Sequence, residues 1–301
     1  MSMTATEIAS QPACWRRAAG MAGAPEGAAF LPPAGAELAV AGCGTSLYMA
    51  QAISALREAA GQGRTDAFAA SEFPLGRDYP YVLALTRSGT TSEVVALLEK
   101  LVGRTTRLLV TGVAGAPASA TADRRLLLDF ADEESVVQTR FATTTLAFVR
   151  AALGEDVEAA SSDAQRALAA PLPLDPVATE QVTFLGTGWT VSLASEAALK
   201  LREAAQLWTE AYPAMEYRHG PISIAAPGRA VWPFGPLPPG LAGQVGATGA
   251  TLVDTAGLDP LAALVLAQRY AVAAAESRGL DPDQPRSLTR SVILPSTEVP
   301  S

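Results

Sequence analysis

One predicted helix carries three charged residues at helical spacing. Nine of the 19 residues 190–208 are alanine or leucine, yet Glu196, Lys200 and Glu203 recur at intervals of four and three residues. At about 100° per residue they fall within an arc of about 60°, so they share one side of the helix. A charged stripe on an apolar helix indicates a cavity, where Glu203 could act as a general base and Lys200 could keep it ionised or neutralise an oxyanion. The alternative is an ordinary exposed Glu–Lys ion pair.

The only histidine of the 301 residues, His219, follows this helix in the segment Glu216-Tyr-Arg-His-Gly-Pro221. An imidazole changes charge near neutral pH, so it can pass a proton in either direction. A lone histidine can equally be a satisfied core or surface side chain. The neighbouring helix, with its base and its lysine, is what favours a chemical role, because a site needs several converging groups.

Two hydroxyl-rich turns each lie between a predicted strand and a predicted helix. Strand 37–41 leads into Gly42-Cys-Gly-Thr-Ser46, and strand 81–85 leads into Thr86-Arg-Ser-Gly-Thr-Thr91. The first N–H groups of a helix have no intrahelical partner and the helix dipole is positive there, so an anion is stabilised. The hydroxyls could instead merely cap the helices. Two such turns on adjacent strands favour one phosphate pocket, and the absence of a Walker loop or a GxGxxG motif argues against a nucleotide.

The elements that position these groups alternate between strand and helix. Further strands are predicted at 107–111, 125–129, 181–185, 229–234 and 250–254, and a long helix at 261–277. Such alternation predicts an α/β fold with parallel sheets covered by helices on both faces. The strand, glycine turn and helix of 37–61 begin again at 181–208, which suggests an internal duplication. We expect an N-terminal arm (1–35), a first subdomain (36–170) and, after a proline-rich break, a second subdomain (178–301).

Composition excludes several classes of protein. The net charge of −8 argues against a nucleic-acid partner, whose phosphates require a basic surface. Two cysteines, Cys14 and Cys43, and one histidine are too few for a disulfide framework or a zinc site, so no metal is expected. No apolar run approaches the roughly 20 residues of a membrane span, and no signal sequence is evident, so no membrane partner and a cytoplasmic location are predicted.

An anion cradle, a base and a ring-opening acid are what isomerisation of a sugar phosphate requires. The segments 42–46, 87–91, 195–203 and 216–221 resemble the sugar isomerase (SIS) family, especially the isomerase module of glucosamine-6-phosphate synthase. Residues 7–12 and 281–291 resemble the opening segment and the C-terminal tail of that module. The resemblance implies two tandem SIS subdomains, each a three-layer, flavodoxin-like α/β/α unit, in a homodimer whose active site borrows groups from the partner.

The resemblance also implies roles for individual residues. Glu203 matches the base that moves a proton between C1 and C2, Lys200 the adjacent active-site lysine, and His219 the ring-opening histidine delivered by the neighbouring subunit. Residues matching the contacts to the sugar phosphate are Gly44, Thr45, Ser46, Thr86, Arg87, Ser88 and Thr91. In a loop that touches the sugar, 136–139, the matching residues are Gln138 and Thr139.

The sequence departs from the family at three points. Nothing in it resembles the glutaminase of the synthase, so amination driven by glutamine is not expected of this chain alone. Arg87 stands where glutamine is usual, and it could add a charge-assisted phosphate contact or fill the pocket. Arg290 replaces the lysine of the tail, and because a guanidinium stays protonated it cannot form an imine.

The expected protein is therefore an enzyme that enolises a hexose or aminohexose 6-phosphate, of the glucosamine-6-phosphate deaminase or isomerase type. Two alternatives stay open: a deglycase acting on a ketosamine phosphate, and a phosphosugar-binding protein without turnover. Retention of both Glu203 and His219 favours the enzyme. No cofactor is expected, because Lys200 and backbone dipoles can stabilise an enediol or enamine.

Overall fold

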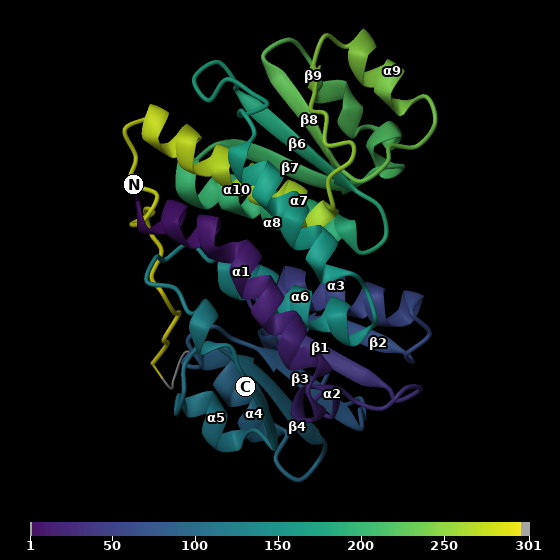
Figure 1. Ribbon diagram of the computed structural model, residues 1–301, viewed down its shortest axis with the longest axis vertical. Helices are drawn as coiled ribbons and strands as arrows, with labels where there is room; N and C mark the ends of the chain where they lie inside the picture. The colour runs from purple at the N-terminus through teal and green to yellow at the C-terminus, as the bar shows by residue number, and fades with distance from the viewer. Residues whose placement is uncertain (1, 296–301) are drawn as a thin grey trace. The chain divides into compact units, whose positions relative to one another are not determined.

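Two separate parallel sheets are built from the alternating strands and helices (Figure 1). The computed structural model describes residues 2–295; Met1 of the predicted arm and residues 296–301 of the predicted second subdomain lie outside that range. Residues 13–157 and 289–295 form one compact unit, here the sheet-A unit, and residues 2–12 and 158–288 form the other, here the sheet-B unit. The predicted α/β class with parallel sheets is confirmed.

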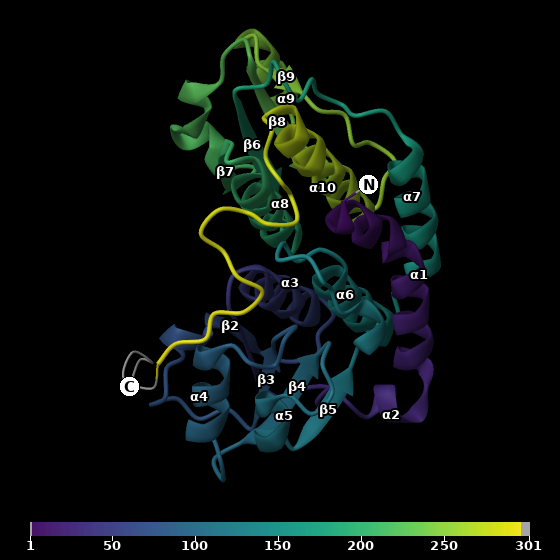
Figure 2. The ribbon, with the colours of Figure 1, turned by 90° about the vertical axis from the view of Figure 1, so that its left-hand side faces the viewer.

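The sheet-A unit has five parallel strands in the order β2-β1-β3-β4-β5, the flavodoxin-like order. Figure 2 shows α3 and α6 on one face of this sheet and α4 and α5 on the other. The order reverses between β1 and β3, and ligands of such sheets bind beyond the carboxyl ends of the strands at this point. The strands are β1 (Leu38–Gly42), β2 (Thr65–Ala69), β3 (Tyr81–Leu85), β4 (Thr106–Thr111) and β5 (Arg124–Leu127). The helices are α2 (Pro25–Ala28), α3 (Thr45–Ala59), α4 (Ser92–Lys100), α5 (Pro117–Thr121) and α6 (Arg140–Ala152), with short 3₁₀ turns η1 (Ala70–Glu72) and η2 (Asp129–Ala131).

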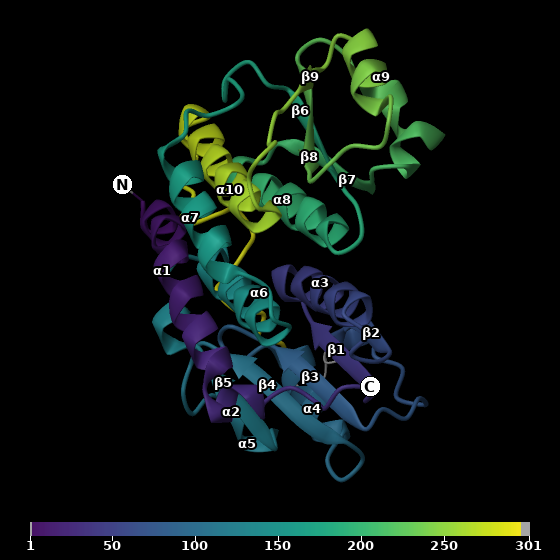
Figure 3. The ribbon, with the colours of Figure 1, turned by 45° about the vertical axis from the view of Figure 1, so that its right-hand side comes forward.

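The sheet-B unit has four parallel strands in the order β7-β6-β8-β9, which repeats the first four positions of sheet A. Figure 3 shows α8 and α10 on one face and α9 on the other. This shared order supports the predicted duplication, which remains a proposal. The strands are β6 (Gln181–Gly186), β7 (Trp208–Pro213), β8 (Arg229–Phe234) and β9 (Thr251–Leu252). The helices are α7 (Val157–Ala169), α8 (Thr190–Ala205), α9 (Leu241–Ala247) and α10 (Pro260–Ser277), with the 3₁₀ turns η3 (Glu216–His219) and η4 (Pro221–Ile224).

The predicted arm contains a long helix, α1 (Met3–Gly23), which includes Pro12. Ile8, Gln11, Trp15 and Ala18 are all buried, at the spacing of one helical face. Small residues and a proline between these positions hid the pattern in the sequence. No helix within residues 2–295 combines the length and hydropathy that crossing a bilayer requires.

The two units divide the chain differently from the predicted domains. Most of α7, assigned by sequence to the first subdomain, belongs to the sheet-B unit. The Arg269 guanidinium of α10 donates hydrogen bonds to the carbonyls of Ala167 (2.6 Å) and Ala170 (2.7 Å), and the Asp163 carboxylate accepts one from the Asp259 N–H (2.7 Å). The proline-rich break therefore lies inside the sheet-B unit. The tail from residue 289 belongs to the sheet-A unit.

The first turn of α1 is capped from far along the sequence. The Asp283 carboxylate accepts hydrogen bonds from the N–H groups of Met3 (2.8 Å) and Thr4 (2.7 Å) and from the Thr4 hydroxyl (2.7 Å). Burial raises the pKa of Asp283, but these hydrogen bonds outweigh it, so the pKa lies below its usual value of 3.8. The ionised carboxylate thus stabilises the folded chain.

We expect Asp283→Asn to lower the free energy of unfolding by about 1 kcal/mol at pH 7, the typical value of an N-terminal helix cap. Because the folded pKa is below the unfolded one, this stabilisation is present above about pH 4 and is lost as the pH falls through the folded pKa. Urea unfolding of wild type and variant at several pH values measures the difference. The exposed Asp78→Asn serves as control, and a difference that persists at the lowest pH would contradict the assignment.

Candidate functional site

Two glycine-containing turns lie at the switch point of sheet A. At Gly42, a Cβ atom would lie 2.6 Å from the backbone of Ser46, and at Gly89 it would lie 2.4 Å from the Ala116 Cβ. Gly44 and Gly89 also have φ values of +55° and +65°, which glycine adopts without strain. The predicted residues Thr45 and Ser46 begin α3, so both turns lead directly into helix N-termini, as the sequence indicated.

The second turn is organised by its own hydroxyls. Thr86 Oγ1 accepts a hydrogen bond from the Gly89 N–H (3.2 Å) and lies 3.3 Å from Thr91 Oγ1. Thr90 Oγ1 donates to Ser88 Oγ (2.9 Å), whose oxygen also accepts from the Thr90 N–H (3.2 Å). These bonds fix the orientation of the hydroxyls that a phosphate would use.

The C-terminal tail passes over this turn, a contact that the sequence did not predict. Ser88 Oγ donates to Ser291 Oγ (3.0 Å), and Thr90 Oγ1 lies 2.9 Å from the same oxygen. The Ser92 N–H at the start of α4 donates to the Val292 carbonyl (3.1 Å), and the Leu294 N–H donates to Ser92 Oγ (2.8 Å). Only the resemblance at residues 281–291 drew attention to the tail, and it pointed to Arg290 rather than Ser291.

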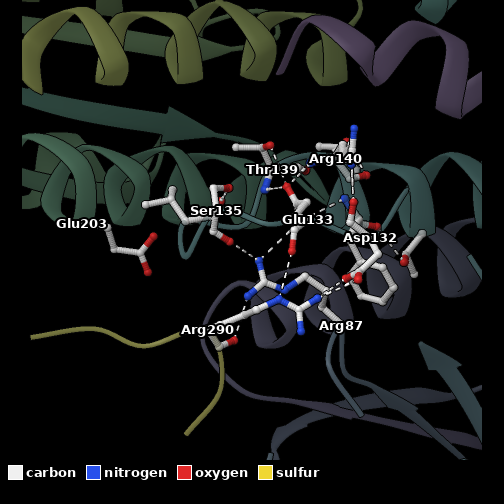
Figure 4. Close-up of polar contacts among 12 residues, drawn as sticks. Arg87, Asp132, Glu133, Ser135, Thr139, Arg140, Glu203 and Arg290 are labelled. Atoms are coloured by element: carbon white, nitrogen blue, oxygen red, sulfur yellow. Dashed lines mark hydrogen bonds and ion pairs between the residues drawn. The ribbon is translucent and has the colours of Figure 1, made fainter. Parts of the chain in front are cut away.

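Arg87 and Arg290 are held by protein groups (Figure 4). The buried Arg87 guanidinium donates to the carbonyls of Ser135 (2.9 Å) and Arg290 (2.7 Å) and lies 3.8 Å from Glu133 Oε2. Arg290 Nη2 contacts both Asp132 carboxylate oxygens (2.6 and 2.7 Å), and its Nε donates to the Glu133 carbonyl (3.0 Å). These contacts give both arginines a structural role beside the turn, and a phosphate contact by Arg87 remains a prediction.

Glu133, which the sequence gave no reason to single out, organises the predicted sugar loop. Its Oε1 accepts hydrogen bonds from the Thr139 N–H (2.5 Å), the Thr139 hydroxyl (2.8 Å) and the Arg140 N–H (2.8 Å) (Figure 4). Gln138 Oε1 is buried and has no hydrogen-bond partner within residues 2–295. No pattern in the sequence distinguishes Glu133 from its acidic neighbours Asp132 and Glu134.

The predicted stripe of charged residues, Glu196, Lys200 and Glu203, lies along α8 and is largely buried. Lys200 Nζ lies 2.5 Å from Glu203 Oε2 and 3.5 Å from Glu196 Oε1, and the Lys200 and Glu196 side chains are only 2% and 1% exposed. The ordinary exposed ion pair is therefore not what the structure contains. A buried ammonium is costly unless it is paired, and the Glu196 and Glu203 carboxylates pair with Lys200 here.

Glu203 lines a cavity of about 550 Å³ in the sheet-B unit. The wall continues through Gln206 and Trp208, after the end of α8, and through Arg286 and Ser287 of the tail. A pocket of this volume is within the usual size range for small-molecule sites. The predicted base thus has access to a space that a ligand can fill.

His219 ends η3 and is exposed, and Gly220 after it has a φ of +128°. Tyr217 is fully buried and anchors the segment, while Arg218 hydrogen-bonds Gln244 Oε1 (2.7 Å). No hydrogen bond or ion pair to the imidazole is found among the described residues. An exposed imidazole on an anchored turn fits the predicted delivery to a neighbouring subunit, which remains a proposal.

Neither cysteine has the properties of a nucleophile. Neither Cys14 nor Cys43 forms a disulfide within the described residues, and Cys14 is buried. Burial, followed by the charge of Glu93, raises the pKa of Cys43 to about 11, so its thiol stays protonated at neutral pH. In the described part of the chain, no group of three or more His, Cys, Asp or Glu side chains is arranged to hold a metal ion.

Sequence similarity to known proteins extends over most of the chain. No protein-family model matches the chain. The glutamine–fructose-6-phosphate aminotransferase (isomerizing) of Aeropyrum pernix is 30% identical over 269 residues, covering 71% of this chain and 43% of that protein. The chain spans about half the length of the relatives that it matches.

Solved structures agree with the sequence comparison. Glucosamine-6-phosphate deaminase from Thermotoga maritima superposes with a TM-score of 0.82 at 24% identity, covering 97% of this chain and 100% of that one. Tagatose-6-phosphate ketose/aldose isomerase from Escherichia coli gives a TM-score of 0.78 at 20% identity, covering 98% and 97%. The chain therefore has the α/β fold of the phosphosugar isomerases. It belongs to the sugar isomerase (SIS) domain family and is homologous to the isomerase part of the glutamine–fructose-6-phosphate aminotransferases.

Proposed function

We propose that the protein is an enzyme that enolises a hexose or aminohexose 6-phosphate. The observation that carries the proposal is the Lys200–Glu203 pair, 2.5 Å apart, with Glu203 on a cavity wall. A paired, ionised carboxylate at a cavity is what abstraction of a proton next to a carbonyl requires. The turns 42–46 and 86–91 would hold the phosphate through helix N–H groups and hydroxyls.

In the proposed reaction on glucosamine 6-phosphate, His219 of a neighbouring subunit opens the ring. Glu203 removes the proton from C2 and returns it to C1, while Lys200 stabilises the negative charge that develops on O1. The resulting iminium at C2 is hydrolysed by water to fructose 6-phosphate and ammonia. A ketosamine phosphate undergoes the same shift in the opposite direction, from C1 to C2.

Product formation tests this proposal. Ammonia and fructose 6-phosphate are measured with glucosamine 6-phosphate, and glucose 6-phosphate with ketosamine 6-phosphates. Turnover of either substrate supports the enzyme. Absence of turnover, with sugar phosphates still raising the melting temperature, would favour the phosphosugar-binding protein instead.

The phosphate assignment predicts a specific effect of Ser88→Ala. We expect the concentration of fructose 6-phosphate needed for half-maximal thermal stabilisation to rise about tenfold, because a hydrogen bond to a charged group is worth about 1.5 kcal/mol or more. Thermal-shift titration of wild type and variant measures it. Ser162→Ala on α7 is the control, and an unchanged titration for Ser88→Ala would contradict the cradle.

A further inference from the structure

A second cavity of the sheet-B unit lies at the carboxyl ends of β8 and β9, which are adjacent parallel strands (Figure 3). It measures about 490 Å³ and shares no lining residue with the cavity at Glu203. Its wall consists of residues 233, 235–237 and 252–258. Ligands of parallel sheets bind beyond the carboxyl ends of the strands, and this volume is within the usual range for small-molecule sites. The cavity is therefore a candidate binding site that the proposed reaction does not use.

The wall of this cavity is mostly apolar, and hydrogen bonds hold it in place. Its large apolar side chains are half-buried: Leu237, Leu252 and Leu258. The buried Thr255 hydroxyl donates to the Pro233 carbonyl (2.9 Å), which ties the segment after β9 to the end of β8. From α7, the Arg166 guanidinium donates to the Gly257 carbonyl (2.7 Å). Because these bonds are made within the protein, the space is formed before a ligand binds.

One charged side chain is found among the described residues that line the cavity, that of Asp254. It is exposed, and its Oδ1 accepts a hydrogen bond from the Ala256 N–H (2.8 Å). Within residues 2–295 this carboxylate has no other hydrogen bond and no ion pair. Arg166, which reaches the rim at Gly257, is paired with Asp163 (2.9 Å). The second oxygen of Asp254 is thus left for a ligand, and a positively charged group complements it.

The turn after β8 lacks the groups that bind an anion. β8 has the position in sheet B that β3 has in sheet A, where the hydroxyl-rich turn 86–91 follows. After β8 comes Gly-Pro-Leu-Pro-Pro-Gly, residues 235–240. Three of these six residues are prolines, which have no N–H to donate, and none of the six has a hydroxyl. A phosphate would find few donors and the charge of Asp254 here, so this position favours a ligand without negative charge.

We propose that this cavity binds an organic ammonium compound, with the charged nitrogen against Asp254 and the apolar part against the three leucines. An ammonium donates the hydrogen bonds that the remaining carboxylate oxygen accepts, and such bonds are strengthened by the charges. Covering the leucines removes apolar surface from water, which favours an ammonium that carries an apolar group over the bare ammonium ion. This site goes beyond the proposed function, because it uses neither Glu203 nor the phosphate turns.

Three probes that differ in charge test the proposal: 2-phenylethylamine, which is a cation at pH 7, 2-phenylethanol and 3-phenylpropanoate. Binding is followed by NMR of isotope-labelled leucine methyl groups. Leu237, Leu252 and Leu258 report on this cavity, whereas Leu207 and Leu288 report on the cavity at Glu203. We expect the first group to shift with the amine at millimolar concentrations, as for so small a ligand. The alcohol should bind about fivefold more weakly, as for loss of one exposed ion pair, and the acid more weakly still.

Two variants separate the role of the carboxylate from that of net charge. Asp254→Asn removes the charge but keeps an oxygen that can accept the Ala256 N–H, and we expect it to bind amine and alcohol within about twofold of each other. Asp281→Asn is the matched control. Asp281 is also exposed, and its Oδ1 also accepts a hydrogen bond from the N–H two residues later, but it lies outside the cavity. This control should keep the wild-type preference, and melting temperatures show whether each variant remains folded.

Each contrary result overturns the proposal for its own reason. If the methyl groups of the three leucines do not shift at about 20 mM amine, the cavity does not bind an ammonium compound. If the three probes bind equally, or Asp254→Asn keeps the preference, the carboxylate does not select the ligand. Shifts confined to Leu207 and Leu288 place the amine in the other cavity. None of these results depends on turnover of sugar phosphates, so the proposed function stands or fails separately.

Discussion

Glu203→Gln is expected to lower kcat on the sugar-phosphate substrate by about 10²–10⁴-fold, the usual contribution of a general base. Glutamine keeps the size of the side chain but cannot take a proton from carbon. In the proposed function the carboxylate acts on the reacting carbon and the turns 42–46 and 86–91 hold the phosphate, so KM should change little. Steady-state kinetics on whichever substrate turns over measures the effect.

Two further variants make this result specific. The exposed Glu99→Gln on α4 should retain full activity, which controls for loss of one negative charge. Glu196→Gln removes the more distant partner of Lys200, 3.5 Å away, and should lower kcat less than Glu203→Gln does. If Glu203→Gln keeps more than a tenth of wild-type kcat with an unchanged melting temperature, Glu203 is not the base.

Elements that have a clear pattern of apolar or charged residues within their own sequence were predicted correctly. Strand 81–85 was placed at its observed bounds, 229–234 likewise, and the α8 stripe followed from spacing alone. The helix was predicted to end at residue 208, but Gln206 takes a left-handed conformation and Trp208 already begins β7. The end of that helix is what creates the cavity wall, and residue spacing does not encode it.

The two strands that the sequence did not predict, β2 and β7, occupy corresponding edge positions in the two sheets. Their residues are mostly half-buried, and neither carries the continuous apolar run of a central strand. β2 contains Asp66, and β7 contains Thr209 and Glu210. An edge strand faces solvent along one side, so its composition resembles that of a loop.

Contacts between residues far apart in the sequence could not be predicted from the sequence. The Arg87–Glu133 pair, the Arg290–Asp132 contacts and the Ser88–Ser291 hydrogen bond join residues brought together only by the fold. The resemblance to the family identified Arg87 and Arg290 as substitutions but not their partners. Each guanidinium is matched here by a carboxylate of the 132–133 segment, so these two departures from the family pattern are accommodated in one small region.

Mixing two inactive variants should restore activity if the histidine acts across a dimer. His219→Asn alone is expected to lower kcat on a ring-closed substrate by about 10²-fold or more, since acid–base assistance to ring opening is lost. In a mixed dimer of Glu203→Gln and His219→Asn, one site combines both substitutions and the other has neither. Random exchange in an equimolar mixture of symmetric dimers therefore restores about a quarter of wild-type activity.

His219 is exposed and has no hydrogen-bond or ion-pair partner among the described residues. The complementation experiment therefore decides whether His219 acts in its own subunit or in the neighbouring one. Subunits are exchanged by dilution and reconcentration, and activity is compared with that of each variant treated alone. Mixing Glu203→Gln with the double variant is the matched control, because no site in any resulting dimer then has both wild-type residues. If the mixture stays inactive although mass spectrometry shows mixed dimers, the histidine acts within its own chain, and if the chain is monomeric at assay concentration, the borrowed histidine is excluded.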